Sequence, residues 1–351
     1  MAGRIVQWAL VAAACVPFVA AAQSGGAASV TFYGLIDVNL NQERAGGDRR
    51  TGVDHGELKG SRWGFRGRED LGSGLAAVFT LEGGFDPTVG GSEQGGRLFG
   101  RQSYVGLEGG FGRVTLGRQY SPAFVALDPL DATGSADRSA GLLTRKAGGV
   151  DPAYEVRFDN MVKYRSPEFA GFSADAGYWL GERGGSRGDA RREGDGWGIA
   201  GLYRSGVVEA ALVTQTVWRD ATGGRVRTDG LGLAYDFGPV RAFAAATRDR
   251  ESGSVGRGRA RTWDVGAELR LPGPNTLALS YARRDESHDR AAEDAHGWSA
   301  YFLHDLSKRT TLYAAYSTLT NDGRANYALG NLRPDRGDDP SVVMAGVRHR
   351  F

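Results

Sequence analysis

The sequence predicts an all-β fold, a 16-stranded antiparallel transmembrane β-barrel, and two observations support this prediction. Apolar and polar residues alternate along many short segments of the chain, and short connections alternate with long polar ones. In a β-strand, successive side chains point to opposite faces, so this alternation gives each strand one apolar and one polar face. Strands joined by short turns at one end and long loops at the other are typical of bacterial membrane barrels.

The alternation is clearest in the segment 262–271. One face carries Trp263, Val265, Ala267, Leu269 and Leu271, whereas the other carries Thr262, Asp264, Gly266, Glu268 and Arg270. The segments 230–237 and 342–351 alternate in the same way. The 55 glycines of the chain and its aspartates are poor strand formers. We therefore expect the closed barrel, rather than local propensity, to hold these segments extended.

The connections set the number of strands. Seven short ones, such as 70–74, lie between eight long polar ones, such as 42–58. This pattern predicts sixteen strands, with both termini at the end of the barrel that carries the short turns. Each unpaired backbone group in hydrocarbon costs roughly several kcal/mol, so a spanning sheet must have no free edge. We therefore expect the segment 29–39 to pair with the segment 341–351.

A secreted β-sandwich or jelly roll would also alternate, and it is the main alternative for the fold. A soluble sheet buries its apolar face in a core, whereas here both faces stay rich in small residues and arginine. Aromatic residues also gather near the predicted strand ends, where membrane barrels carry two aromatic girdles. No segment after residue 22 approaches the roughly 18 consecutive apolar residues of a membrane helix. The barrel is therefore the preferred interpretation.

Residues 1–22 have the composition of a secretory signal peptide. Arg4 supplies a positive charge, an apolar stretch follows, and three consecutive alanines offer a cleavage site. We place the barrel domain at residues 23–351. Cys15, the single cysteine, lies in the segment that would be removed, so neither a disulfide nor a thiolate metal site is expected. Acylation of Cys15, as in a lipoprotein, is disfavoured because Ala12 stands where a larger aliphatic residue is expected.

Six blocks distributed over the chain carry a family resemblance. They are QSGGAASVTFYGLID (23–37), SRWGFRGREDLGSGL (61–75), VTLGRQ (114–119), DNMVKYRSPEFAGF (159–172), DLSKRT (305–310) and GVRHRF (346–351). Together they resemble the trimeric general porins of Gram-negative β-proteobacteria, in the order that this family has them. The resemblance implies a water-filled outer-membrane channel for passive diffusion of small hydrophilic solutes and ions, with no cofactor and no enzymatic activity.

The resemblance also implies details of the architecture and the partners. Short turns would face the periplasm, long loops would face the exterior, and a third loop at about 120–160 would fold inward to narrow the channel. The expected partners are two further copies in a homotrimer, outer-membrane lipid with lipopolysaccharide, the barrel-assembly machinery and the permeating solutes. No nucleic-acid partner is expected, because basic and acidic residues alternate. Phe351 would be the signal that the assembly machinery reads; alternatively, it only ends a strand.

Four arginines are candidates for a positive wall at the constriction. Arg62 and Arg66 share the polar face of one predicted strand, and the resemblance aligns Arg62, Arg101 and Arg157 with the basic cluster of these porins. Arginine keeps its charge at any working pH and is weakly hydrated, and rings of charge set ion preference in pores. Alternatively, these arginines only solvate the lumen or pair with loop acids. Arg101 fits less well, since it shares a face with apolar residues further along its strand.

The loop at 120–160 is too long and too apolar for a freely solvated connection. Folding into the lumen would explain both features. Its acidic residues are candidates for a negative rim opposite the arginines: Asp128, Asp131, Asp137, Asp151 and Glu155. Because the opposing wall is positive, we expect a weak preference for anions.

Arg118 shares a face with Val114 and Leu116, which we expect to point outward. An arginine on the lipid face near the middle of the membrane costs about 2–4 kcal/mol. We therefore predict that Arg118 lies near a strand end or in a subunit interface, where Glu93 of a neighbouring subunit is a candidate partner.

The remaining motifs give no catalytic site. The five histidines fall mostly in predicted loops or at strand ends, without the spacing of a helical zinc site, and the carboxylates scatter rather than pair. Two alternatives stay open. A substrate-specific channel would show saturable flux of one solute. An outer-membrane hydrolase would need a nucleophile with a histidine, for which the sequence offers no candidate block.

Overall fold

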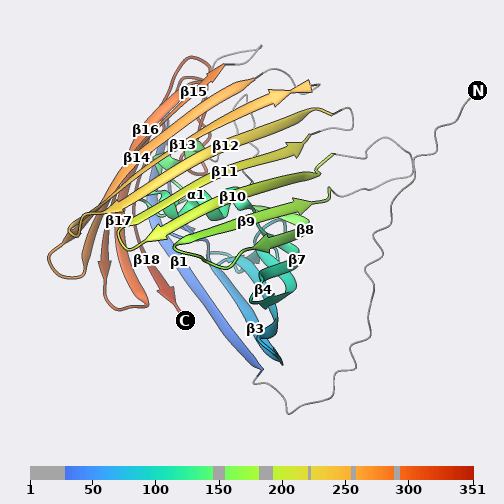
Figure 1. Cartoon of the computed structure of the whole chain (residues 1–351). Helices are drawn as coiled ribbons and strands as arrows, with labels where there is room; N and C mark the ends of the chain where they lie inside the picture. Colours follow the sequence, from blue (N-terminus) through green and yellow to red (C-terminus); the bar gives the residue numbers. More distant parts are fainter. Residues whose placement is uncertain (1–27, 145–154, 182–192, 220–222, 254–257, 288–292) are drawn as a thin grey trace, which may run out of the picture.

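The computed structural model describes residues 28–144, 155–181, 193–219, 223–253, 258–287 and 293–351. The predicted signal peptide lies outside this part of the chain. The described residues form an 18-stranded antiparallel sheet. Its strands are β1 (Ser29–Ala45), β2 (Asp48–His55), β3 (Arg62–Gly72), β4 (Leu75–Asp86), β5 (Gly91–Ser92), β6 (Gln102–Gly109), β7 (Gly112–Tyr120), β8 (Arg157–Arg165), β9 (Phe172–Trp179), β10 (Gly196–Ser205), β11 (Val208–Trp218), β12 (Arg225–Asp236), β13 (Val240–Ser252), β14 (Arg259–Leu271), β15 (Asn275–Ser287), β16 (Ala295–Asp305), β17 (Thr310–Asn321) and β18 (Ser341–Arg350). β1 pairs with β18, which closes the sheet into a barrel (Figure 1).

The eighteen strands amount to sixteen that build the barrel wall. β2 pairs with the second half of β1 and β3 with its first half, so these two form one wall strand that is interrupted at residues 56–61. β5 is a two-residue strand that pairs with β4 within a loop. The predicted fold class, including the pairing of the first strand with the last, is therefore confirmed.

The first long connection differs from the prediction. The expected loop at 42–58 is mostly a hairpin, in which β1 runs to Ala45 and β2 begins at Asp48. The turn between them uses Gly46 at a φ of 55°, a backbone conformation that glycine adopts without strain. The alternation of polarity missed this hairpin because both of its faces are largely polar.

The outward face of the barrel wall is apolar. Along β12, for example, the outward side chains of Leu231 and Leu233 are exposed, whereas Gly232 and Ala234 on the other face are buried. An exposed apolar band of this kind is what contact with lipid requires.

The described part of the connection between β7 and β8, up to residue 144, lies inside the barrel (Figure 1). It carries three short helices, α1 (Pro122–Leu127), η1 (Asp128–Leu130) and η2 (Ala140–Thr144). We call residues 121–156 loop 3. None of the helices among the described residues is long and apolar enough to cross a membrane. The predicted inward-folded third loop is confirmed.

Small inward residues of the wall make room for the first half of loop 3. Its buried residues pack against Ala200, Ala211, Val213, Ala234 and Phe243 of β10 to β13. A Cβ atom on Gly232 would lie 2.6 Å from Cδ1 of Leu130, and one on Gly266 would lie 2.5 Å from Cβ of Ala132. Both glycines are therefore required by the close approach of the loop to the wall.

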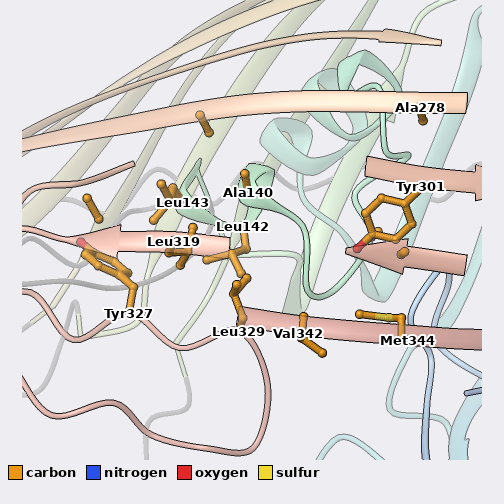
Figure 2. Close-up of a cluster of buried hydrophobic side chains, with 14 of the residues drawn as sticks. Ala140, Leu142, Leu143, Ala278, Tyr301, Leu319, Tyr327, Leu329, Val342 and Met344 are labelled. Atoms are coloured by element: carbon orange, nitrogen blue, oxygen red, sulfur yellow. The ribbon is translucent and has the colours of Figure 1, made fainter. Parts of the chain in front are cut away.

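Residues 136–143 of loop 3 pack in a larger apolar cluster with residues of β15 to β18 (Figure 2). Leu142 and Leu143 are fully buried there, against Tyr301 of β16, Leu319 of β17 and Met344 of β18. Tyr327 and Leu329, from the connection between β17 and β18, complete the cluster. The described part of loop 3 therefore extends along the wall from β9 to β17, and a cavity remains between it and β3.

Candidate functional site

The four predicted arginines lie together on one wall of the lumen. Arg62 and Arg66 project from β3, Arg101 precedes β6, and Arg157 begins β8. All four line a cavity of about 710 Å³ between this wall and loop 3. The strand order brings these elements together, because β3, β4, β6, β7 and β8 are consecutive neighbours in the sheet.

One acid that the sequence analysis did not name lies within this arginine wall. Glu82 of β4 accepts hydrogen bonds from Nε of Arg101 at 2.9 Å and from the hydroxyl of Tyr33 at 2.9 Å. Nη2 of Arg101 in turn donates to the hydroxyl of Tyr120 at 2.9 Å. The signal for Glu82 was present in the sequence, because it shares a face with Thr80, which is also buried.

The other three arginines are held by neutral groups. Nε of Arg62 donates to the backbone carbonyl of Gly60 at 2.9 Å. The guanidinium of Arg66 lies 4.1 Å from the ring centre of Tyr33, and that of Arg157 lies 4.9 Å from the ring centre of Tyr120. These are cation–π distances, which fix a guanidinium without neutralising it. Within the described residues, no salt bridge reaches Arg62, Arg66 or Arg157.

Arg101 points into the lumen, although the alternation of inward and outward residues along its strand predicts the opposite. Val105 and Leu107 of β6, which share its face in the sequence, are exposed on the outer surface. The strand begins only at Gln102, so Arg101 lies before the regular alternation, and its backbone N–H donates to the carbonyl of Glu82 at 3.1 Å. Its side chain is thus free to turn inward, where Arg101 is 7% exposed.

The loop acids occupy different positions. Asp128 forms a salt bridge with Nζ of Lys59 at 3.1 Å, and Asp137 lines the same cavity as the arginines. Asp131 accepts hydrogen bonds from the backbone and hydroxyl of Thr133 at 2.8 and 2.7 Å, so it stabilises a turn of loop 3. Glu155 lies 3.5 Å from Arg219 instead of facing the arginine wall. Asp151 falls outside the described residues. A role for these acids at the constriction stays a prediction.

A buried ionic cluster attaches loop 3 to the interruption between β2 and β3. Nη1 of Arg138 lies 3.2 Å from Glu57, and its Nη2 lies 3.0 Å from Asp54. The carboxylate of Glu57 also accepts hydrogen bonds from the backbone N–H of Arg138 at 3.2 Å and the hydroxyl of Tyr301 at 2.6 Å. Glu57 is fully buried. Loop 3, which lies opposite the arginines, is therefore anchored by Glu57 in the interruption between β2 and β3.

Arg118 lies on the outer face, as its parity predicts, but its partner comes from its own chain. Nη1 of Arg118 lies 2.7 Å from Asp159, which also pairs with Arg97 at 2.7 Å. Glu93 lies elsewhere, with Oε1 at 3.5 Å from Nε2 of His55. An interface role for Arg118 therefore stays a prediction.

Phe351 packs at the seam between the first and last strands. Its backbone N–H donates to the carbonyl of Gly34 at 3.0 Å, and its carbonyl accepts from the N–H of Gly34 at 3.1 Å. Its ring centre lies 5.7 Å from that of Phe32. Gly34 leaves the space for the aromatic ring, since a Cβ there would lie 2.3 Å from it. A role of Phe351 as an assembly signal stays a prediction.

One group of side chains has ligands of the kind that a metal ion takes. Potential ligand atoms of His55, Asp86 and Glu93 lie within 4.8 Å of one another at the rim of the cavity. Oδ1 of Asp86 already accepts from the backbone N–H of Thr88 at 2.7 Å, so only its other oxygen faces His55.

This chain is similar to known outer-membrane porins. The family described as Gram-negative porin matches residues 9–324. An outer membrane porin protein of Bordetella pertussis is 31% identical and covers 97% of this chain and 99% of that protein. Outer membrane porin protein 32 of Delftia acidovorans is also 31% identical and covers 94% of this chain and 97% of that protein. Among solved structures, an anion-selective porin from Comamonas acidovorans has a TM-score of 0.82 at 29% identity, and the match covers 93% of this chain and 100% of that chain.

Proposed function

Since the chain belongs to the Gram-negative porin family, it is an outer-membrane β-barrel channel and not an enzyme, and we propose that its constriction gives the channel a weak preference for anions. The family, the location and the channel function that the sequence predicted are confirmed.

The observation that carries the anion preference is the unequal pairing of charge across the constriction. Of the four wall arginines, Arg101 is paired with Glu82 at 2.9 Å, whereas Arg62, Arg66 and Arg157 contact carbonyl or aromatic groups. On the opposite side, Asp128 is paired with Lys59, and Asp137 is in no salt bridge among the described residues, so three unpaired arginines face one unpaired acid. Unpaired guanidinium groups keep their positive potential, and a positive ring in a narrow pore raises the local concentration of anions.

The test is the reversal potential of the channel in a planar bilayer under a salt gradient, comparing the wild-type protein with Arg62→Glu. We expect an anion-signed potential in the wild type that moves toward the cation sign in the variant. Arg309→Glu, in an exposed short turn, is the matched control and should leave the potential unchanged. An unshifted potential in Arg62→Glu would reject the arginine wall as the selectivity element, while the channel itself would stand.

The assembly and partners of the channel are also part of the proposal. We propose a homotrimer, recognition of the strand that ends at Phe351 by the barrel-assembly machinery, and contact with outer-membrane lipid including lipopolysaccharide. The exposed ring of Phe32 on β1 and the half-buried ring of Phe65 on β3, with ring centres 5.4 Å apart, offer an apolar surface for subunit contact. The mass of the detergent-solubilised protein, measured by light scattering, tests the trimer. A single-subunit mass for a protein that conducts ions would reject it.

A further inference from the structure

Seven arginines gather on the outward face of four neighbouring strands. We call them the arginine patch: Arg225 and Arg227 of β12, Arg248 and Arg250 of β13, Arg259 and Arg261 of β14, and Arg283 of β15. They share the outward face with exposed apolar residues such as Leu231 and Trp263. All seven lie at the end of the barrel that carries the long loops, which is the extracellular end in this family.

The strand register places like charges directly opposite each other in this patch. Arg227 is the Cα partner of Arg250, and Arg250 is in turn the partner of Arg259. Two residues further along the same strands, Arg248 is the Cα partner of Arg261. Like charges directly opposite in neighbouring strands destabilise a sheet. The arrangement therefore needs negative charge from somewhere to offset this repulsion.

The chain supplies only part of that negative charge. Asp229 pairs with Arg227 at 2.8 Å and with Arg250 at 3.1 Å, and Asp285 pairs with Arg283 at 2.7 Å. Asp229 is also the Cα partner of Arg248, and Asp285 is that of Arg261. In the part of the chain that the structure describes, however, no salt bridge reaches Arg248, Arg259 or Arg261, and two acids stand against seven arginines on this face. The patch therefore keeps a positive excess on an outward-facing surface.

The depth of the patch is fixed by the residues beside it. Trp263 follows Arg261 by two positions on the same face of β14, which corresponds to about 7 Å along a strand. Its ring centre lies 5.3 Å from that of Tyr281 on β15. Outward aromatic residues of this kind mark the level at which hydrocarbon gives way to lipid head groups. The arginine patch therefore lies at the head groups of the outer leaflet.

We propose that the arginine patch binds the phosphate groups of lipopolysaccharide, the phosphorylated glycolipid of the outer leaflet. Guanidinium groups bind phosphate oxygens in bidentate geometry, and arginines directly opposite each other on neighbouring strands can bind the same phosphate. The bound phosphates would also offset the repulsion between opposed arginines. This inference rests on the lipopolysaccharide contact proposed above and adds its location and chemistry. It does not depend on the constriction, which faces the lumen.

The direct test compares lipopolysaccharide affinity of the full-length detergent-solubilised protein with that of the triple variant Arg248→Gln/Arg259→Gln/Arg261→Gln. Each arginine near a charged membrane surface contributes on the order of fivefold in affinity, so we expect a loss of about a hundredfold. The matched control removes three exposed arginines at the opposite end of the barrel, Arg68→Gln/Arg204→Gln/Arg309→Gln, and should bind as the wild type does. Equal affinity in the wild type and the first variant would overturn the proposal.

Two further measurements separate the possible occupants and the possible failures. Enzymatically dephosphorylated lipopolysaccharide should bind the wild-type protein about as weakly as intact lipopolysaccharide binds the triple variant. If the wild-type protein bound the dephosphorylated and the intact lipid equally tightly, acyl chains or sugars, and not phosphates, would be recognised. Without lipopolysaccharide, the triple variant should melt at a higher temperature than the wild type, because the opposed charges are gone. With lipopolysaccharide, this order should reverse, and an unchanged order would contradict the proposal.

Channel function is assayed separately in a bilayer of uncharged lipid. The triple variant should show the single-channel conductance of the wild type there, because the patch faces away from the lumen. Loss of conductance in both proteins would count against the proposed anion channel and leave the patch standing. Normal conductance with unchanged lipopolysaccharide affinity would reject the patch alone.

Discussion

The two sides of the lumen follow the same alternation of inward and outward residues, yet they carry opposite chemistry. On the side of β3, β4 and β8, the inward residues include Arg62, Arg66 and Glu82, which border the open cavity. On the side of β10 to β18, the inward residues include Ala200, Ala234 and Ala282, which are buried beneath loop 3. The alternation along a strand therefore determines whether a side chain points inward or outward. Whether an inward side chain contacts water or is buried depends on loop 3.

This difference separates two tasks within one barrel. Apolar contacts on the dry side fix the loop, and the ionic anchor at Glu57, in the interruption before β3, holds it from the other side. We therefore expect these contacts to set the width of the pore. The wet side carries charged residues that line the open cavity, so we expect selectivity to be set there. Substitutions on the dry side should change stability and conductance, whereas those on the wet side should change ion preference at nearly constant stability.

The largest effect is expected at the ionic anchor of loop 3. Arg138→Ala leaves Glu57 as an unpaired buried acid, which costs about 3–5 kcal/mol in the free energy of unfolding. Urea unfolding in detergent micelles, followed by tryptophan fluorescence, measures this loss, and single-channel records should show larger current fluctuations. The double variant Glu57→Gln/Arg138→Met removes both charges and should recover much of the stability. Equal losses in the single and double variants would contradict an uncompensated charge as the cause.

A somewhat smaller loss is expected in the apolar contact of loop 3 with the wall. Leu143 is fully buried, and removing such a side chain costs about 2–5 kcal/mol through lost transfer energy and the cavity left behind. Leu143→Ala should therefore lower the urea midpoint. Leu231→Ala removes the same atoms from the lipid-facing surface, where Leu231 is 51% exposed. If both variants lost the same stability, the dry side would not be the structural half of the lumen.

The fold could be predicted from the sequence because contact with lipid requires apolar outward side chains on every wall strand. An alternating segment such as 262–271 has its outward face fixed by that requirement, and Trp263 and Val265 are indeed exposed. The requirement does not apply where the strand is not in lipid. The hairpin of β1 and β2 was therefore missed, since beyond residue 39 its outward face carries only Leu40 and Val53 among polar residues.

The sequence could predict which arginines lie together at the candidate site, but not which side chains they and the loop acids contact. Arg62, Arg66, Arg101 and Arg157 lie together as expected, but Glu82 was missed, since alternation shows that a residue faces inward and not what it touches. The acids of loop 3 share one segment of the sequence, yet Asp131 binds its own turn and Glu155 faces Arg219. The interaction partners of a loop side chain depend on the path of the loop backbone, which has no regular repeat from which that path could be predicted.

The smallest effect, and the sharpest test of the wet side, concerns Glu82. Glu82→Gln removes the negative partner of Arg101 while keeping a side chain that can accept hydrogen bonds from Arg101 and Tyr33. The wall then gains one unit of positive charge, so the reversal potential should move further toward the anion sign. The shift should be about half that of Arg62→Glu and opposite in sign, since that substitution changes the charge by two units. Glu108→Gln, whose acid pairs with Arg68 and Arg113 near the short turns, is the control and should shift the potential less. A shift of Glu82→Gln toward cations would mean that Glu82 holds the arginines in place, and that their geometry rather than their net charge sets the preference.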